Sequence, residues 1–270
     1  MAQMTNYLLT LQYDGTRYDG WQKQKQSSRT IQGKLESVLT EFVQTPVEVY
    51  GSGRTDAGVH ALGQTASVKL PGFFKKEELL TYLNHYLPED IRVLCAETVT
   101  DSFHARLSAI RKTYAYHVDT GSKKDVFERK YVYGFPFPLD REAMEQASRY
   151  LTGTHDFKSF CGNKKMKKST IRTLENICIR EQNGRFTFVY TGNGFLQYMV
   201  RILTGTLMEV GLGRKSPVCV KEILVAKDRS AAGFTAPPEG LFLVSVEYSM
   251  EEMMSRCGYN RKQSACKKPG

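Results

Sequence analysis

Residues 51–61, with the sequence GSGRTDAGVHA, combine a guanidinium, a carboxylate and an imidazole with small side chains. The segments on either side, residues 47–50 and 64–70, read as strands, so this stretch is predicted to be a loop between them. Glycines allow such a loop to bring its backbone close to a ligand. A carboxylate on it can act as a base or a nucleophile, which makes Asp56 a candidate catalytic residue. The structural alternative is an ion pair of Arg54 with Asp56 across a tight turn.

Three further stretches place reactive side chains at positions where a site could form. Residues 103–114, FHARLSAIRKTY, end on Tyr114, which either belongs to a core strand or faces a cleft. Residues 192–201, GNGFLQYMVR, carry Arg201 among apolar helix positions, so its guanidinium faces solvent or a carboxylate. Residues 236–243, APPEGLFL, form a rigid turn that either walls a pocket or ends a loop.

Two basic segments could contact a polyanion. Residues 16–26 form a loop that holds Trp21, the only tryptophan, beside Lys23 and Lys25. Aromatic and basic side chains together can stack on bases and hold phosphate, although Trp21 could equally fill the edge of a core. Residues 163–168, NKKMKK, form a second lysine-rich loop.

The overall composition favours a nucleic-acid partner. The 270-residue chain has 41% hydrophobic residues and a formal net charge of +10, which suits a globular protein that binds polyanions. Its apolar segments are short, and no signal peptide is visible, so we expect a cytoplasmic protein without a membrane span. The six cysteines show no metal-binding spacing and the five histidines are scattered, so neither disulfides nor a metal site is expected.

The predicted elements form two similar halves. Strands at residues 7–13, 47–50, 64–70 and 91–100, with helices from residue 30 and over 77–86, give the order β-α-β-β-α-β, which is the ferredoxin-like arrangement. The second half repeats this order with one extra helix. Its strands are predicted over 111–118, 171–181, 185–191 and 241–248, and its helices over 141–151, 195–210 and 218–227.

These patterns divide the chain into three parts. We expect an N-terminal ferredoxin-like half at residues 1–104, which carries the Asp56 loop, and a C-terminal ferredoxin-like half at 105–249. The fold class is therefore α+β, with a mainly antiparallel sheet and a cleft between two RRM-like halves. Residues 250–270 are polar and basic without periodicity, so a mobile tail is expected there.

Taken together, these stretches resemble one family. Residues 53–61, GRTDAGVHA, look like the signature of the TruA-type tRNA pseudouridine synthases. Residues 13–16 with 20–24, the 103–114 segment, residues 192–201 and residues 236–243 also resemble that family, in its order. The resemblance covers residues 7–248 and implies the pseudouridine synthase fold.

The resemblance also implies an activity and its residues. Enzymes of this family isomerise uridine to pseudouridine in tRNA, here in the anticodon arm, without a cofactor and as homodimers. Asp56 matches the catalytic aspartate, and Arg201 matches the arginine paired with it. Tyr114 matches the tyrosine that stacks on the target base, Arg54 matches the arginine that helps to flip the nucleotide, and Leu241 is expected to contact the substrate.

Basic side chains around the cleft are expected to hold the RNA backbone, and the interaction should be sensitive to salt. The candidates are Lys23, Lys25, Arg111, Lys112, Lys164, Lys165, Lys167 and Lys168.

Three alternatives remain open at this point. The segment 161–168 is richer in lysine than is usual in the family, which leaves room for a paralogue that modifies other tRNA positions or ribosomal RNA. A non-catalytic RNA-binding protein is a second alternative, although such a protein has no need of Asp56. An acid–base glycoside hydrolase would require a second carboxylate near Asp56, and its loop contains none.

Overall fold

The computed structural model of the chain describes residues 3–121, 125–163 and 165–253. The N-terminal half has the predicted order of strands and helices: β1 (Met4–Tyr13), α1 (Ile31–Val43), β2 (Val49–Gly51), β3 (His60–Pro71), α2 (Lys76–Tyr86) and β4 (Ile91–Val99). A short 3-10 helix, η1 (Gly15–Arg17), follows β1. Helix α1 begins at a capped end, because the Thr30 hydroxyl accepts a hydrogen bond from the Gly33 N–H.

The C-terminal half adds short elements to the predicted order. Its elements are β5 (Ala109–Asp119), β6 (Tyr133–Gly134), α3 (Arg141–Leu151), β7 (Gly153–Asp156), η2 (Lys158–Phe160), β8 (Ile171–Gln182), β9 (Arg185–Gly192), α4 (Met199–Gly211), α5 (Cys219–Ala226), η3 (Pro238–Gly240), β10 (Leu241–Tyr248) and α6 (Met250–Met253). Strands β6 and β7 are too short to show a periodic pattern and exist because they pair with β5 and β8.

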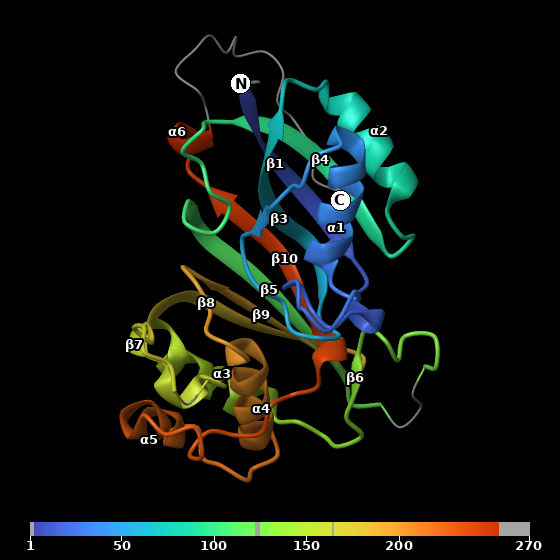
Figure 1. Cartoon of the computed structure of the whole chain (residues 1–270). Helices are drawn as coiled ribbons and strands as arrows, with labels where there is room; N and C mark the ends of the chain where they lie inside the picture. Colours follow the sequence, from blue (N-terminus) through green and yellow to red (C-terminus); the bar gives the residue numbers. More distant parts are fainter. Residues whose placement is uncertain (1–2, 122–124, 164, 254–270) are drawn as a thin grey trace.

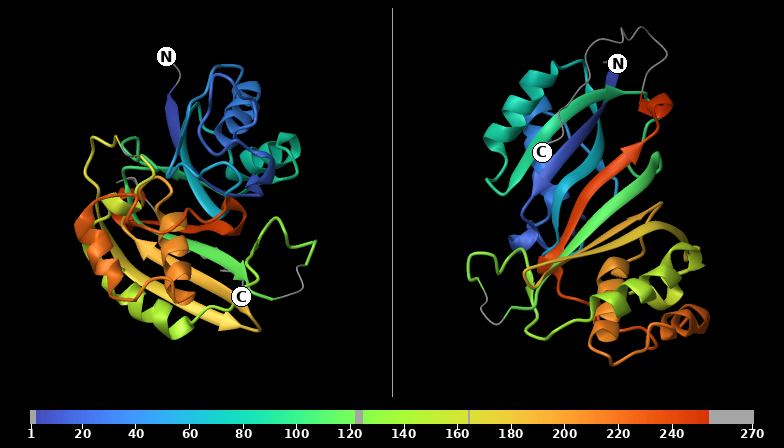
Figure 2. Two further views of the ribbon diagram at one scale, coloured as in Figure 1. Left: turned by 90° about the horizontal axis from the view of Figure 1, so that it is seen from below. Right: turned by 180° about the vertical axis from the view of Figure 1, so that it is seen from behind.

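All the strands join one sheet (Figure 1, Figure 2). Its order is β4-β1-β3-β10-β5-β9-β8-β7, with β2 paired to β3 and β6 paired to β5. Most pairs are antiparallel, which confirms the predicted fold class. Each half contributes the order that a β-α-β-β-α-β unit produces, and the halves meet where β3 and β10 run parallel. Helices α1 and α2 pack on the first half of the sheet, and α3, α4 and α5 lie with the second half.

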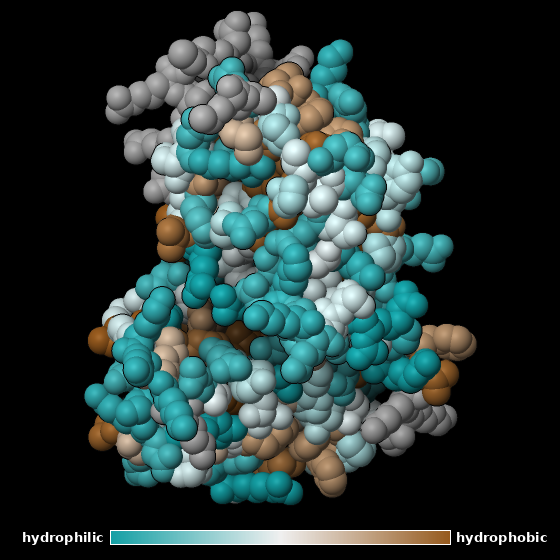
Figure 3. Space-filling model, in the orientation of Figure 1, coloured by the Kyte–Doolittle hydropathy of each residue, from teal (hydrophilic) through white to brown (hydrophobic). Residues whose placement is uncertain are grey.

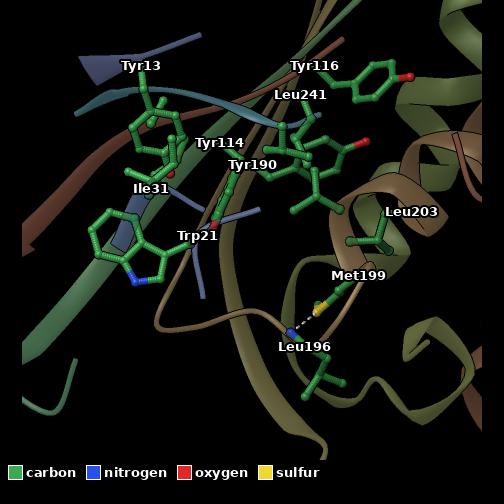
Figure 4. Packing of buried hydrophobic residues seen from close by; sticks show 14 of the residues in the cluster. Tyr13, Trp21, Ile31, Tyr114, Tyr116, Tyr190, Leu196, Met199, Leu203 and Leu241 are labelled. Carbon is green, nitrogen blue, oxygen red and sulfur yellow. Dashed lines mark hydrogen bonds between the residues drawn. The ribbon is translucent and has the colours of Figure 1, made fainter. Parts of the chain in front are cut away.

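One hydrophobic core runs through both halves (Figure 4). Tyr13 and Trp21 come from the first half, Met199 and Leu203 come from α4, and Tyr114 lies between them. Because the same cluster contains side chains from both halves, their relative position is set by packing. In the described part of the chain, none of the helices is both long enough and apolar enough to span a bilayer.

The structure corrects one sequence prediction and decides between the two alternatives left open for Trp21. The helix expected from residue 195 begins at Met199, because Tyr198 has a left-handed backbone (φ 59°) that interrupts the helical conformation. Trp21 is only 2% exposed and belongs to the core, so it does not present a surface for stacking bases.

The expected mobile tail is also not entirely irregular, since Met250–Met253 form α6. The rest of that tail, residues 254–270, lies outside the described residues.

Candidate active site

The loop that carries Asp56 is fixed on one side by the segment after β1. The backbone N–H of Trp21 donates to the carbonyl oxygen of Thr55 (3.0 Å), and the Thr55 hydroxyl is 2.8 Å from the Tyr13 hydroxyl. Gly20 makes this close approach possible, because a Cβ on it would lie 2.8 Å from the Thr55 carbonyl oxygen. The residue before Asp56 is thus held through both its backbone and its side chain.

The other side of the loop is held by β3 and β5. Gln64 accepts a hydrogen bond from the Ser52 hydroxyl (2.6 Å) and donates one to the Gly53 carbonyl (3.0 Å). The Lys112 ammonium donates to the Ser52 carbonyl at 2.6 Å. These contacts give the loop a defined shape before any ligand binds.

Strand register brings Tyr114 to the same place. Strand β3 begins at His60, directly after the loop, and Ala61 pairs with Leu243 of β10. Leu243 in turn pairs with Tyr114 of β5, so the three residues form a row across adjacent strands. Tyr114 is 8% exposed, and its ring makes a T-shaped contact with the Phe195 ring at a centroid distance of 4.9 Å.

Arg201, in the first turn of α4, connects Asp56 to a third element. Its Nη1 donates to Oδ2 of Asp56 at 3.2 Å, and its Nε donates to the carbonyl oxygen of Ala236 at 2.7 Å. Its guanidinium also lies over the Tyr198 ring, 5.2 Å from the centroid. Of the two predicted surroundings of Arg201, solvent or a carboxylate, the structure shows the carboxylate. The 236–243 turn also helps to build the site, through the carbonyl of Ala236.

A cavity of about 400 Å³ lies between the halves, and Asp56 is on its wall. A hollow with an apolar floor and a polar rim is visible where the two halves meet (Figure 3). The cavity is the size of a small-molecule site and can hold one nucleoside. Arg54, Tyr114 and Leu241, all predicted site residues, line it as well.

Charge in this cavity is unevenly distributed. Asp56 is the only acidic residue among those that the structure places around the cavity, whereas four basic residues line it: Arg54, Arg106, Lys112 and Arg172. None of these four has an ion-pair partner within the described part of the chain. Such a cavity favours a ligand with several negative charges.

Burial alters the titration of three side chains in the site. It raises the pKa of Asp56, while the charge and hydrogen bond of Arg201 lower it, and the net result is a raised pKa. Burial, with the nearby Tyr13 and Asp56, raises the pKa of Tyr114 well above its usual range, so this hydroxyl stays protonated. Burial lowers the pKa of Lys112 to about 8, assisted by the charges of Arg106 and Arg172.

The predicted RNA-binding residues are scattered over the surface. Lys112 lines the cavity, but Lys23 pairs with Glu36 (2.8 Å), and Arg111 pairs with both Glu175 (2.7 Å) and Glu247 (2.9 Å).

The remaining candidates are lysines of two loops. Lys25, Lys165 and Lys167 are exposed and do not line the cavity, whereas Lys168 lines a neighbouring one. Lys164 lies outside the described residues.

The sequence predictions do not include two of the cations in the cavity, Arg106 and Arg172. Arg106 lies within the 103–114 stretch, and its position next to the predicted junction was the available signal. Arg172 is the second residue of β8 and has no distinctive neighbour in sequence, so only the fold reveals it. His60, although it belongs to the signature stretch, is 1% exposed and stacks on Phe242 at 4.7 Å outside the cavity.

The described residues contain no group of three or more His, Cys, Asp or Glu side chains placed to hold a metal ion. The chemistry that the site offers is that of one carboxylate with a guanidinium partner. Together with Tyr114, it can perform nucleophilic or acid–base steps on a base or sugar bound in the cavity.

Comparison with known proteins supports one family. The family model for tRNA pseudouridine synthase matches residues 10–107 and 147–249. The tRNA pseudouridine synthase A of Bacillus sp. (strain KSM-64) is 47% identical over 245 residues, which cover 91% of this chain and 100% of that protein. The protein of the same name from Limosilactobacillus reuteri (strain DSM 20016) is 43% identical, with coverage of 92% and 99%. The tRNA pseudouridine synthase A 2 of Bacillus anthracis is 41% identical, with coverage of 91% and 100%. The chain therefore belongs to the tRNA pseudouridine synthase family.

Proposed function

We propose that this protein isomerises uridine to pseudouridine in tRNA, with Asp56 as its single catalytic carboxylate and without a cofactor. The observation that carries the proposal is the position of Asp56, which pairs with Arg201 and lines a cavity whose other charged lining residues are basic. Family membership supports the reaction. The same pair gives no support to glycoside hydrolysis, which requires two carboxylates.

The reaction exchanges the N1–C1′ bond of uridine for a C5–C1′ bond. C5 loses its proton, and N1 gains one. Asp56 could attack C1′, add to C6 or remove the C2′ proton, and each route needs one ionised carboxylate. Arg201 opposes the effect of burial and favours the ionised form of Asp56. Tyr114 stacks on the base and, with its protonated hydroxyl, takes part in the proton exchange.

The target base must leave the RNA stack to reach Asp56. Arg54 is exposed beside Asp56 and is placed to occupy the gap that the flipped base leaves. Leu241 forms part of the cavity wall and can pack against the uracil ring. Lys112, Arg106 and Arg172 supply positive charge for the adjoining phosphates.

We place the target in the anticodon arm, and the active form is a homodimer in the cytoplasm. These assignments rest on the resemblance to the TruA-type enzymes. Analytical ultracentrifugation would test the dimer, because a species of twice the 30.6 kDa chain mass is expected.

The catalytic assignment is tested by incubating the protein with unmodified tRNA and mapping pseudouridine at each position. Asp56→Ala is expected to reduce conversion by at least about a thousandfold, since the reacting group is lost. Its affinity for tRNA should stay within about threefold of the wild type, because the phosphate contacts remain. Near-normal turnover by the variant would contradict the assignment of Asp56.

A second target is worth testing in the same assay. Asn163 and Met166, from the lysine-rich loop, line the cavity, so this loop can contact the substrate. Including ribosomal RNA and all tRNA positions in the map would show whether the loop directs the enzyme to another uridine.

A further inference from the structure

A second cavity, of about 470 Å³, adjoins the Asp56 cavity. Arg54 and Arg106 line both, so these two side chains form the boundary between them. Lys168 and Leu107 also line the second cavity, together with β2 and the loop around Trp21. A ligand long enough to occupy both cavities would pass between the two arginines.

One wall of the second cavity is a pair of rings, Tyr50 and His104, whose centroids are 5.1 Å apart. Tyr50 is 47% exposed, although it lies on a strand of the sheet. Its hydroxyl donates to Glu48 (2.5 Å), and Nδ1 of His104 accepts from the Arg106 N–H (3.1 Å). Both rings are therefore held in position without a ligand.

The backbone beneath His104 is also fixed by polar groups. Buried Asn6 donates to the carbonyls of Thr100 (2.8 Å) and Phe103 (3.0 Å). The Ala105 N–H donates to the Ser67 hydroxyl (3.1 Å), and the Ala105 carbonyl accepts from Tyr248 (2.8 Å). This segment joins the halves, yet its contacts make it a rigid wall.

Three other polar residues that line this cavity already form hydrogen bonds with one another. Gln22 donates to Gln32 (2.7 Å), and Gln32 donates to Glu36 (2.8 Å) and to the Val49 carbonyl (3.1 Å). Hydrogen-bonding groups that are occupied in this way contribute little to reading a base edge. The free features of the cavity are its aromatic rings and its cations.

We propose that the second cavity binds the nucleotide next to the target uridine in the RNA chain. The base of that nucleotide stacks on the exposed ring of Tyr50, which His104 supports from the side at an interplanar angle of 46°. The phosphate that links the two nucleotides lies against Arg106, at the boundary between the two cavities. This inference rests on the proposed function. It adds a binding site that recognises the presence of a neighbouring base more than its identity, since stacking tolerates any base.

The test pairs a protein change with an RNA change. Two tRNA transcripts would carry an abasic nucleotide immediately 5′ or 3′ of the uridine that the wild-type protein converts. One of them should lower wild-type kcat/KM by about fivefold to a hundredfold, the range expected for loss of one stacked base. Tyr50→Ala should show a similar loss on intact tRNA and no further loss on that abasic transcript.

Tyr86→Ala is a matched control, because Tyr86 is an exposed tyrosine that also contacts a histidine, His85, at 4.7 Å, but lies on α2 away from both cavities. It should retain wild-type activity. Tyr50→Phe keeps the ring and should stay within about twofold of the wild type, which separates stacking from misfolding.

The inference is overturned if Tyr50→Ala lowers kcat/KM on the abasic transcript as much as it does on intact tRNA. It is also overturned if neither abasic transcript lowers the kcat/KM of the wild type, or if Tyr50→Ala retains wild-type activity as Tyr86→Ala should. Absence of conversion by the wild type on any intact RNA would instead refute the proposed function.

Discussion

At the scale of single residues, Asp56 is in an environment that opposes its charge. Burial raises its pKa, and the contact with Arg201 only partly offsets this effect. The ionised carboxylate therefore costs folding free energy in return for a reactive, poorly hydrated anion. Acid loss of activity should accordingly have its midpoint above the 3.8 of an ordinary aspartate.

The first prediction concerns stability. Well below pH 3.8 both the folded and the unfolded states carry a protonated Asp56, so it contributes no difference. As the pH rises from 3.8 through the raised folded pKa, the unfolded state ionises first and the folded state loses stability relative to a neutral side chain. Asp56→Asn should therefore melt at a higher temperature than the wild type at pH 7, and this gain should vanish as the pH approaches 3.8.

Asp14→Asn is a control of opposite sign. Burial raises the pKa of Asp14, but hydrogen bonds from Thr16 and Tyr131 and the charge of His60 lower it overall. This variant should lose stability at pH 7. If Asp56→Asn also melts below the wild type at pH 7, the environment assigned to Asp56 is wrong.

The second prediction concerns Lys112, whose pKa is lowered to about 8. Its charge should be lost between about pH 7 and pH 9, and with it one contact to phosphate. The kcat/KM for tRNA should then fall by about threefold over this range through Lys112 alone. Lys112→Arg keeps its charge and should reduce the dependence on pH; an unchanged profile would show that Lys112 does not contact RNA.

At the scale of elements, the proposed active site depends on how closely the loop after β1 approaches the Asp56 loop. Gly20 has a positive φ of +94°, and a Cβ there would meet the backbone of Thr55, Asp56 and Ala57. Neither the backbone of residue 20 nor that of the Asp56 loop can move freely, because the backbone N–H of Trp21 is hydrogen-bonded to the carbonyl oxygen of Thr55. A side chain at residue 20 should therefore displace the carboxylate.

The third prediction compares Gly20→Ala with Gly72→Ala. Gly72 also has a positive φ, +87°, but a Cβ there has nothing within 4 Å. Gly72→Ala should cost about 1 kcal/mol of stability from backbone strain and leave kcat unchanged. Gly20→Ala should cost more and lower kcat about tenfold or more, because a small displacement of a catalytic group is expensive. Urea unfolding and single-turnover kinetics would measure the two effects; equal kcat values would contradict this role of Gly20.

At the scale of the whole molecule, a net charge of +10 attracts RNA, but only some cations are available to bind it. Arg111 is neutralised by two carboxylates, whereas Arg172 donates to the carbonyls of Ser169 and Ile171 and to no carboxylate among the residues that the structure describes. We therefore expect net charge to supply the long-range attraction and the unpaired cations of the cavity to set the position of the RNA.

The fourth prediction follows from this difference. Arg172→Ala should reduce the slope of log affinity for tRNA against log salt concentration by about one. Arg111→Ala should leave the slope nearly unchanged, since removing Arg111 also frees Glu175 and Glu247. A filter-binding titration over a range of salt concentrations would measure both, and equal slopes for the two variants would refute the distinction.

The longer elements of both halves were predictable, because strand alternation and helix spacing are local properties. The grouping of Asp56, Tyr114 and Arg201 came instead from the resemblance to a known family. The roles of these residues, and the division at residues 104 and 105, remain predictions. The start of α4 was not predictable, because the left-handed backbone of Tyr198 interrupts an otherwise helical pattern.

The sequence by itself determined the α+β class, the order of its elements and the type of chemistry that one carboxylate beside a guanidinium can perform. Only the tertiary structure decided which charges surround that carboxylate. The register of β3, β10 and β5 brings Asp56 and Tyr114 together. The segment before β5 adds Arg106, strand β8 adds Arg172, and packing of the loop after β1 buries Trp21. The physical reason is that an electrostatic field depends on distances in space, and residues from separate strands acquire those distances only when the sheet forms.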